Sequence, residues 1–413
     1  MERIILHSDL NSFYATVECL HNPEIRDKPV AVGGSVEQRH GIILTKNILA
    51  KKHGIKTGEA IWQAKQKCPD LVVLPPNYKL YLYFSKEARN IYNYYTDLVE
   101  SFGIDECWLD VTESSKLFGS GEKIANEIRE RMKNELGITC SIGVSYNKIF
   151  AKLGSDIKKP DATTVITRDN FKKEVWPLPV SDLLYVGRAT CRKLMNIGVY
   201  TIGDLANLNI GFLKKYLGKW GEYLWTFANG FDETPVAKSD FDSVIKGIGN
   251  SMTTPRDLVN NEDVKILLYV LSESVAERLR RHNFKSRTIQ IYVRDNQLQS
   301  FDRQAQLSDY SCIANVIAQK AYEIFLKNYT WEKPIRSIGV RATDLVTADT
   351  NMQLSIFDDE KHKKKKEQLE YSIDEIRKRF GHYSVQRALL LKNKDLNANP
   401  IEDNVIFPIS YFR

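Results

Sequence analysis

The chain opens on a short apolar run, RIILHSDL at 3–10, which predicts a strand with the polar residue Asp9 near its end. The next segment, 11–20, has helical apolar spacing, and the Lys- and Gly-rich stretch 31–70 mixes a strand with short helical pieces. Aromatic residues then recur three to four positions apart over 78–102, which predicts a long helix. The first hundred residues therefore read as β and α segments around a small insert.

Alternating segments continue to about residue 168. An amphipathic helix is predicted over 120–136, a strand over 138–145, a helix over 147–159 and a strand over 163–167. The order is β, the insert, then α β β α β α β. This order predicts a sheet with helices on one face, assembled from segments that are distant in sequence.

The second half divides differently. Short helices with Gly turns are predicted over 175–232, and DETPVAKSDFDS at 232–243 has the composition of a linker. Beyond it the pattern is β α β β α β, a second small α+β domain, and a further helix is predicted over 366–380. No long-period repeat is visible.

Composition adds broad limits. The chain has 413 residues, enough for two to four domains, and its net charge of +7 permits a polyanionic partner without requiring one. Its six cysteines show no Cys-x-x-Cys spacing, so a zinc site is not expected and buried thiols in a reducing compartment are. The N-terminus does not resemble a signal peptide, and no apolar run has the length of a membrane span. We therefore expect a cytoplasmic protein without membrane contact.

The stretch SFGIDECWLD at 101–110 places two acids, Asp105 and Glu106, inside a strand-like run. One interpretation is a hairpin turn with both acids in solvent. The other is a metal site completed by Asp9, because converging carboxylates repel one another unless divalent cations neutralise them. Hard oxygen ligands suit Mg²⁺, and two such ions can support phosphoryl transfer. Spacing alone leaves both interpretations open and favours the solvated turn.

A second Ile-Asp-Glu string occurs in YSIDEIRKRF at 371–380. An apolar stripe with helical spacing runs through it, formed by Leu369, Ile373, Ile376 and Phe380. Asp374 and Glu375 lie off this stripe, one turn before Lys378 and Arg379, which predicts a charged helix face. Only the first string is a candidate site.

Three further segments carry candidate chemistry. Thr45, Lys51, Lys52 and Lys56 lie among flexible glycines, where they suit a triphosphate, but a solvated basic helix would look the same. Lys152, Lys158 and Lys159 are equally ambiguous. Phe13 and Tyr14 follow Asp9 and could pack beneath a bound sugar, or simply be core aromatics.

Five motifs then appear in order: LHSDLNSFYATVE, TKNILAKKHGIKTG, GIDECWLDVT, SIGVSYNKIFAKLGSDIKKP and GRATCRKLMNIGVYTIGDL. Together they resemble the Y-family DNA polymerases, of the DNA polymerase IV and UmuC-like translesion type. The resemblance runs from residue 1 to about 345, and the ordered set is far more specific than any one motif.

The resemblance implies an α+β multidomain, right-hand polymerase with a ferredoxin-like palm, small fingers, a helix-hairpin-helix thumb and a βαββαβ little finger. The implied bounds are 1–18 and 76–168 for the palm, 19–75 for the fingers, 169–232 for the thumb, 233–243 for a linker, 244–346 for the little finger and 347–413 for a C-terminal extension.

It also implies roles for single residues. Asp9, Asp105 and Glu106, with the carbonyl of Leu10, would hold two Mg²⁺ ions, for which Mn²⁺ can substitute. Tyr14 would be the steric gate that blocks a ribose 2′-hydroxyl. The residues implied to contact the incoming deoxynucleoside triphosphate are Phe13, Tyr14, Thr45, Lys51 and Lys159.

Several positions depart from the family pattern. Asn11 stands where an Asp is usual, Ile48 and Lys51 replace a Tyr and an Arg that touch phosphates, and Gly103 replaces a common Ser. Lys keeps the charge of Arg without its bidentate fork, and Ile can donate nothing. Weak nucleotide affinity is the resulting hypothesis, and a low KM in a nucleotide titration would count against it.

Primer-template DNA is the implied macromolecular substrate. The Gly-centred turns of the predicted thumb would bind phosphates through backbone N–H groups, and a basic segment of the predicted little finger would grip the duplex backbone. The implied contacts are Gly187, Arg188, Gly198, Arg278, Arg280, Arg281, Lys285 and Arg287.

QLSIF at 353–357 resembles the clamp-binding peptide of bacterial polymerases. Gln353, Leu354, Ile356 and Phe357 would engage a hydrophobic groove of the sliding clamp, the β subunit, and tether the enzyme. The alternative is a stray apolar patch in a linker. A monomer is expected, and the role of the tail after the peptide is open.

The predicted function is low-fidelity, template-directed DNA synthesis across damaged templates by two-metal nucleotidyl transfer, in DNA repair. One alternative is a catalytically weak relative that binds DNA and the clamp without synthesis. Another is a nucleotide cyclase, which would have no use for a duplex-binding thumb and little finger.

Overall fold

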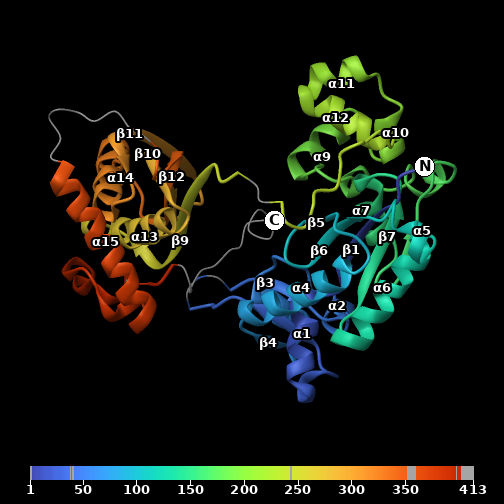
Figure 1. The fold of residues 1–413 in the computed structure, drawn as a ribbon, viewed down its shortest axis with the longest axis horizontal. Helices are drawn as coiled ribbons and strands as arrows, with labels where there is room; N and C mark the ends of the chain where they lie inside the picture. Colours follow the sequence, from blue (N-terminus) through green and yellow to red (C-terminus); the bar gives the residue numbers. More distant parts are fainter. Residues whose placement is uncertain are drawn as a thin grey trace. The chain divides into compact units, whose positions relative to one another are not determined.

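The fold is that of a computed structural model, which describes residues 2–37, 39, 41–241, 244–350, 360–396 and 398–400. The described chain forms two compact units, one over residues 2–34 and 42–241 and the other over the described residues of 35–41 and 244–400. Figure 1 shows the elements of each unit.

A five-stranded sheet organises the first unit, in the order β5-β6-β1-β7-β8. Its strands are β1 (Ile5–Leu10), β5 (Val99–Ser101), β6 (Glu106–Asp110), β7 (Cys140–Ser145) and β8 (Thr163–Val165). β1 is central and pairs antiparallel with both β6 and β7. The predicted hairpin around Asp105 is therefore present, and it lies beside the first strand.

Helices cover both faces of this sheet, so the prediction of one covered face is wrong. The elements around it are α1 (Phe13–His21), α4 (Tyr78–Asn93), α5 (Ser115–Phe118), α6 (Gly121–Leu136) and α7 (Lys148–Ile157). Leu6 and Leu10 of β1 share a core with α4 and α6, whereas Ile5 packs with Ala151 of α7. Neighbouring strand residues point to opposite faces, and β1 is buried along its whole length, which requires cover on both sides.

The predicted helix 78–102 ends early, because its last residues form a strand. α4 stops at Asn93, and Val99–Ser101 forms β5 against β6. Thr96 helps the chain to turn here, since its hydroxyl donates to the carbonyl of Asp110 at 2.8 Å and accepts from the N–H of Leu98 at 3.1 Å.

A smaller three-stranded sheet, in the order β3-β2-β4, follows α1. Its elements are η1 (Pro23–Ile25), β2 (Val30–Gly33), β3 (Ile43–Lys46), α2 (Ile48–Lys52), α3 (Ile61–Lys67) and β4 (Val72–Leu74). Asn47 caps α2 by accepting from the N–H of Ala50 at 2.9 Å, which fixes where the helix begins after β3.

Short helices make up the rest of the first unit: α8 (Phe171–Glu174), η2 (Val180–Asp182), α9 (Arg188–Met195), α10 (Ile202–Ala206), α11 (Ile210–Leu217) and α12 (Lys219–Ala228). Phe150 and Leu153 of α7 belong to their core, so α7 lies between the large sheet and these helices.

The second unit holds a four-stranded antiparallel sheet, in the order β11-β10-β12-β9. Its elements are β9 (Gly247–Leu258), α13 (Asn261–Arg281), β10 (Phe284–Asp295), β11 (Ser300–Ser311), α14 (Ala314–Asn328) and β12 (Ile335–Thr347). This is the predicted β α β β α β order, and both helices pack on the sheet through one large apolar core.

A helical C-terminal segment belongs to the same unit: α15 (Glu360–Phe380), η3 (His382–Ser384), η4 (Ala388–Lys392) and η5 (Lys394–Leu396). The predicted apolar stripe of α15 is largely exposed, at 59% for Leu369, 41% for Ile376 and 66% for Phe380. α15 instead faces α13 with charged side chains. None of the described helices is long and apolar enough to cross a membrane.

Candidate active site

Two of the predicted carboxylates lie opposite each other on neighbouring strands. Asp9 of β1 pairs in register with Glu106 of β6, and directly opposed residues of an antiparallel pair point to the same face. The N–H of Leu10 donates to the carbonyl of Asp105 at 3.0 Å, which fixes the third acid at the start of β6. The register of one strand pair therefore brings Asp9, Asp105 and Glu106 together.

The turn that carries Asp105 is fixed by α4, a support that the sequence did not reveal. Arg89 donates to the hydroxyl of Ser101 at 2.9 Å and to the carbonyl of Gly103 at 3.1 Å, and Ser85 donates to the carbonyl of Ile104. Gly103 has φ +115°, a conformation that strains any residue with a side chain. The Gly in place of the family's usual Ser is thus the residue that this turn needs.

Two lysines of the α7 region face the acids. The Lys159 ammonium lies 2.8 Å from Asp9 Oδ2, and the Lys152 ammonium lies 2.8 Å from Glu106 Oε2 and 3.9 Å from Asp9 Oδ2. Lys159 and Lys152 also approach Asp156, at 2.8 Å and 3.7 Å. Cations thus neutralise these buried carboxylates, as buried charges require.

The electrostatics of the acids reflect their crowding. Burial, the neighbouring Glu106 and then Asp9 raise the pKa of Asp105 to about 7. Burial also raises the pKa of Asp9, against the opposing effect of Lys159. A divalent cation would relieve the repulsion among these three carboxylates and would favour their charged forms.

His7 lies beside this cluster, fully buried on β1. Its Nδ1 lies 2.9 Å from the Ser155 hydroxyl, and its Nε2 lies 3.5 Å from Glu106 Oε2. Within the described chain, neither His7 Nε2 nor Glu106 Oε2 has a hydrogen-bond partner of normal geometry. Glu106 Oε2 is instead held by the Lys152 ammonium, 2.8 Å away, so a metal ion at this oxygen would replace an ion pair.

These residues fit Mg²⁺ by donor chemistry, although no three described His, Cys, Asp or Glu side chains already surround one point as metal ligands. The donors are hard oxygens, and one of them lacks a well-aligned hydrogen-bond donor. The lysine ammoniums occupy positions where a cation would neutralise the same charges.

A cavity of about 400 Å³ adjoins the acids and is lined by all five predicted nucleotide contacts. Its lining includes Asp9, Leu10, Phe13, Tyr14, Thr45, Lys51, Asp105 and Lys159. The Tyr14 ring stacks on Tyr81, with centroids 4.3 Å apart and planes 8° apart, and the Tyr81 hydroxyl donates to the buried Glu18 at 2.6 Å. Packing and one hydrogen bond thus fix the orientation of Tyr14.

Two residues of this cavity were missed by sequence reasoning. Lys46, at the end of β3, donates to the Thr57 hydroxyl at 2.9 Å, and both line the cavity. Burial, and next the positive charge of Lys51, lower the pKa of Lys46. The signal in the sequence that could have suggested Lys46 is its position directly after Thr45, in a motif whose side chains alternate.

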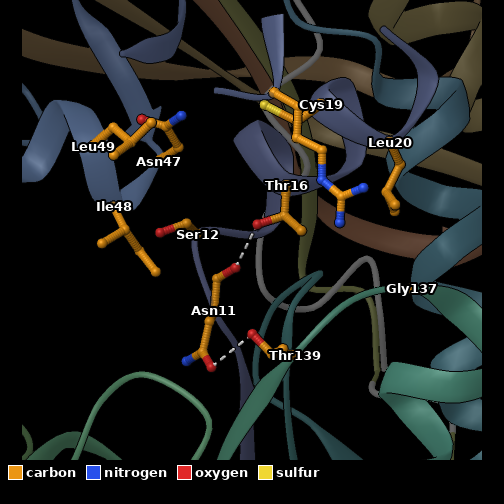
Figure 2. Close-up of a pocket in the computed structure, with 11 residues that line it drawn as sticks. Asn11, Ser12, Thr16, Cys19, Leu20, Asn47, Ile48, Leu49, Gly137 and Thr139 are labelled. Atoms are coloured by element: carbon orange, nitrogen blue, oxygen red, sulfur yellow. Dashed lines mark hydrogen bonds between the residues drawn. The ribbon is translucent and has the colours of Figure 1, made fainter. Parts of the chain in front are cut away.

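Asn11 and Ile48, two departures from the family pattern, line a neighbouring pocket of about 250 Å³ (Figure 2). The Asn11 amide is fully engaged: it donates to the Ser141 hydroxyl at 3.0 Å and accepts from Thr139 at 3.2 Å and from the N–H of Asp161 at 2.9 Å. Asn11 therefore ties β1 to β7 and to the loop after α7. Ile48 is 48% exposed and offers no polar group.

The predicted DNA contacts of the first unit are exposed. Gly187 caps the start of α9, Arg188 is its first residue, and Gly198 has φ +80° with open space where a Cβ would stand. The N–H groups of a first helical turn lack helical acceptors, so this end can accept phosphates.

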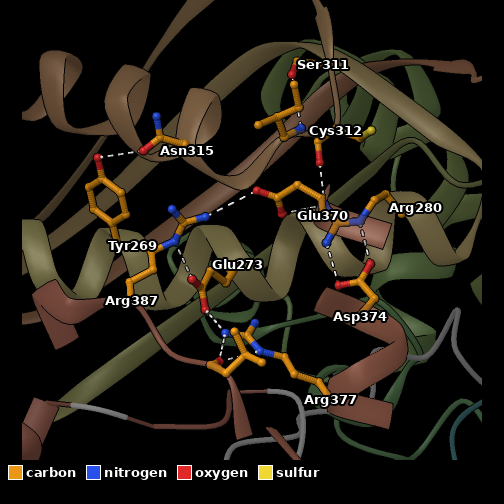
Figure 3. A network of polar contacts seen from close by, with 12 residues as sticks. Tyr269, Glu273, Arg280, Ser311, Cys312, Asn315, Glu370, Asp374, Arg377 and Arg387 are labelled. Carbon is orange, nitrogen blue, oxygen red and sulfur yellow. Dashed lines mark hydrogen bonds and ion pairs between the residues drawn. The ribbon is translucent and has the colours of Figure 1, made fainter. Parts of the chain in front are cut away.

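The second unit corrects two predicted DNA contacts. The Arg280 side chain is only 3% exposed and pairs with Asp374 through two hydrogen bonds of 2.6 and 2.7 Å (Figure 3). It also lies 3.2 Å from Glu370, and Lys285 lies 2.9 Å from Glu367. Acids of α15 pair with both cations, so neither Arg280 nor Lys285 is proposed as a DNA contact.

The remaining cations of that segment are differently placed. Arg281 is exposed and pairs with Glu277 at 2.6 Å, Arg287 is exposed over the Tyr310 ring, and Arg278 donates to the carbonyl of Gly249 at 3.0 Å. Arg281 and Arg287 are available to a polyanion, and Arg278 is partly committed.

The second Ile-Asp-Glu string is structural, as expected, but its partner differs from the prediction. Asp374 pairs with Arg280 of α13 and not with Lys378 of its own helix. The proposed clamp peptide, with Gln353, Leu354, Ile356 and Phe357, lies outside the described residues.

Two family models match the chain: the impB/mucB/samB family over residues 8–156, and the C-terminal domain of that family over 245–356. DNA polymerase IV of Acetivibrio thermocellus is 62% identical over 96% of this chain and 100% of its own length. DNA polymerase IV of Clostridium kluyveri is 36% identical over 95% of this chain and 99% of its own. Among solved structures, a Y-family DNA polymerase chimera matches with a TM-score of 0.72 at 25% identity, over 83% of this chain and 99% of that one.

The fold and these relatives place the chain in the class of multidomain, DNA-directed nucleotidyltransferases. Within that class, the chain belongs to the Y family of DNA polymerases. It is a translesion DNA polymerase, and dependence on a divalent metal is general in this family.

Proposed function

We propose that Asp9, Asp105 and Glu106, with the Leu10 carbonyl, hold two Mg²⁺ ions and carry the polymerase reaction, with Mn²⁺ as a substitute. The single observation that carries this proposal is the register of β1 against β6, which puts Asp9 and Glu106 on one face beside Asp105. When bound, the ions lower the pKa of the primer 3′-hydroxyl and neutralise charge on the transferring phosphate.

The chain's own groups then position the reactants. The primer 3′-hydroxyl loses its proton to solvent, its oxygen forms a bond to the α-phosphorus of the nucleotide, and the bond from that phosphorus to pyrophosphate breaks. Lys159, already 2.8 Å from Asp9, is placed to pair with phosphate oxygens once Asp9 turns to a metal ion. Thr45 and Lys51 line the same cavity and would contact the triphosphate.

We add Lys46 to the proposed triphosphate contacts, because its ammonium can donate to phosphate oxygens and Ile48 cannot. Lys46 lies in the cavity with Lys51, and these two ammoniums repel each other unless an anion binds between them, whereas Lys159 in the same cavity is already paired with Asp9 and Asp156. The triphosphate supplies that anion. This cluster argues against the weak nucleotide affinity expected from Ile48 and Lys51 alone.

Tyr14 acts as the steric gate. Its ring cannot swing aside freely, because it stacks on Tyr81 and meets the Tyr78 ring edge-on at 6.0 Å. A ribose 2′-hydroxyl over this ring would clash, whereas a deoxyribose fits. Phe13 is buried behind it and supports the gate.

We propose the four domains with the bounds predicted from the sequence. The five-stranded sheet would be the palm, the three-stranded sheet the fingers, the short helices the thumb and the four-stranded sheet the little finger. Primer-template DNA would contact Gly187, Arg188 and Gly198 in the thumb, and Arg278, Arg281 and Arg287 in the little finger. The clamp peptide at 353–357 would tether the enzyme as a monomer to the sliding clamp.

Metal counting tests the central part of this proposal. The enzyme is mixed with a chain-terminated primer-template and a matching nucleotide, and bound Mn²⁺ is measured by electron paramagnetic resonance. We expect two ions per wild-type chain and fewer for Asp105→Asn. Asp374→Asn, a change in the second Ile-Asp-Glu string, serves as the matched control and should keep both ions. One ion or none in the wild type would contradict the two-metal site.

A further inference from the structure

The C-terminal helix α15 separates its charges by face. Its acids Glu367, Glu370 and Asp374 follow one another at three- to four-residue spacing and pair with Lys285 and Arg280. Arg377, on the same face, pairs with the buried Glu273 at 2.9 Å (Figure 3). The polar network thus fixes which side of α15 faces α13.

A lysine run occupies the start of the same helix. KHKKKK spans 361–366, and Lys361, Lys365 and Lys366 are all exposed. These three ammoniums make no ion pair or hydrogen bond with any described residue, whereas Lys363 is held by Asp309. Lys361 and Lys365 are one helical turn apart, so they project from neighbouring points on the side away from α13, whereas Lys366 is exposed on the flank between that side and the α13-facing stripe.

This run is in an unfavourable place for the helix. The first turn of a helix carries the positive end of its macrodipole, so a cation such as Lys361 is unfavourable there. Like charges four residues apart, such as Lys361 and Lys365, also repel each other. A run that opposes the stability of its own helix, with no described acid to compensate these three lysines, is the pattern expected of a functional surface.

DNA is the occupant that the charges favour. The enzyme works on DNA, and its phosphates would neutralise both the lysines and the end of the helix. Ammoniums on flexible stems contact phosphates without reading sequence, as an enzyme acting on arbitrary templates requires. Because acids of α15 pair with Arg280 and Lys285, these two cations are not available to DNA. The exposed lysines of α15 supply cationic charge on the surface of the same unit.

We propose that Lys361, Lys365 and Lys366 form a phosphate-binding face for DNA on the C-terminal helix. The ion-pair network between α13 and α15 orients this face. The lysine face lies outside the match to the family's C-terminal domain model, because that match ends at residue 356.

The test is the salt dependence of DNA binding by the full chain. Lys361, Lys365 and Lys366 are changed together to Gln, and the affinity for primer-template DNA is measured by fluorescence anisotropy over a range of salt concentrations. The slope of log K against log salt should become shallower by about 0.9 for each phosphate that these lysines neutralise in the wild type. The melting temperature should hold or rise, because repulsion at the start of α15 is removed.

A matched control removes the same charge elsewhere. Lys116, Lys123 and Lys133 are exposed on α5 and α6, elements that carry none of the expected DNA contacts, and they are changed to Gln together. The proposal requires a shallower slope for the first variant than for this control. Equal slopes in both variants would reduce the effect to net charge and overturn it. An unchanged DNA slope with weakened heparin binding would assign the face to another polyanion and overturn it too.

Discussion

At the scale of single residues, the site depends on the electrostatic repulsion among three acids. Asp105 is buried next to Glu106 and Asp9, and its pKa is raised to about 7. Lys152 and Lys159 balance the other two acids but contact Asp105 less directly. With Asp105 as a ligand, as proposed, its protonation would compete with metal binding near neutral pH.

This competition predicts how the magnesium requirement depends on pH. A raised carboxyl pKa means that the proton is bound below about pH 7 and must leave before Mg²⁺ binds. The Mg²⁺ concentration that gives half-maximal single-nucleotide incorporation should therefore rise up to about tenfold per pH unit below 7 and level off above it. DNA binding measured at each pH is the control. A half-saturating concentration that stays constant from pH 6 to 8 would contradict the raised pKa.

Residue chemistry was predictable where short motifs carry it. Asp9, Asp105, Glu106 and Tyr14 could be named from sequence because five ordered motifs resemble the Y family, whereas spacing alone favoured a solvated turn and a core aromatic. Lys46, Ser85 and Arg89 could not, because their roles depend on which loop each side chain reaches. Asn11 looked like a missing charge and proves to be a structural hydrogen-bonding residue.

At the scale of elements, α15 shows where periodicity misleads. Its apolar stripe predicted a buried face, yet Leu369 and Phe380 are exposed and the charged face packs on α13. Hydrophobic spacing identifies a helix but not its partner. Here the partner is a set of cations, Arg280 and Lys285, far away in sequence, which no local pattern reveals.

The Arg280–Asp374 pair should be costly to break from one side. Arg280→Met removes the partner of Asp374 and leaves the buried Glu370 with Arg387 alone, and we expect a loss of about 3–5 kcal/mol in the unfolding free energy. Replacing both partners, as in Arg280→Met with Asp374→Leu, should recover much of that loss, because an apolar pair leaves one charge fewer unpaired.

Urea unfolding followed by circular dichroism measures both variants. Arg281→Met is the matched control, since its exposed pair with Glu277 should contribute about 1 kcal/mol or less. A single variant as stable as the wild type would show that α15 is held by other contacts.

At the scale of the whole molecule, order along the chain was the strongest signal. Five motifs in sequence identified a polymerase when each alone was ambiguous, and the second unit's β α β β α β order was readable from periodicity. The cover on both faces of the large sheet was not, because that depends on how α7 returns across β1 and β7. The domain bounds and the clamp peptide stay predictions.

Primer extension with two matched variants tests the central claim most directly. The chain carries two Ile-Asp-Glu strings, and only Asp105 is expected to serve catalysis. With Mg²⁺ and four deoxynucleotides, on undamaged and abasic templates, wild type and Glu375→Ala, a change at an exposed acid of the second string, should both extend the primer, and Asp105→Ala should not. Extension by Asp105→Ala, or binding without extension by the wild type, would contradict the account.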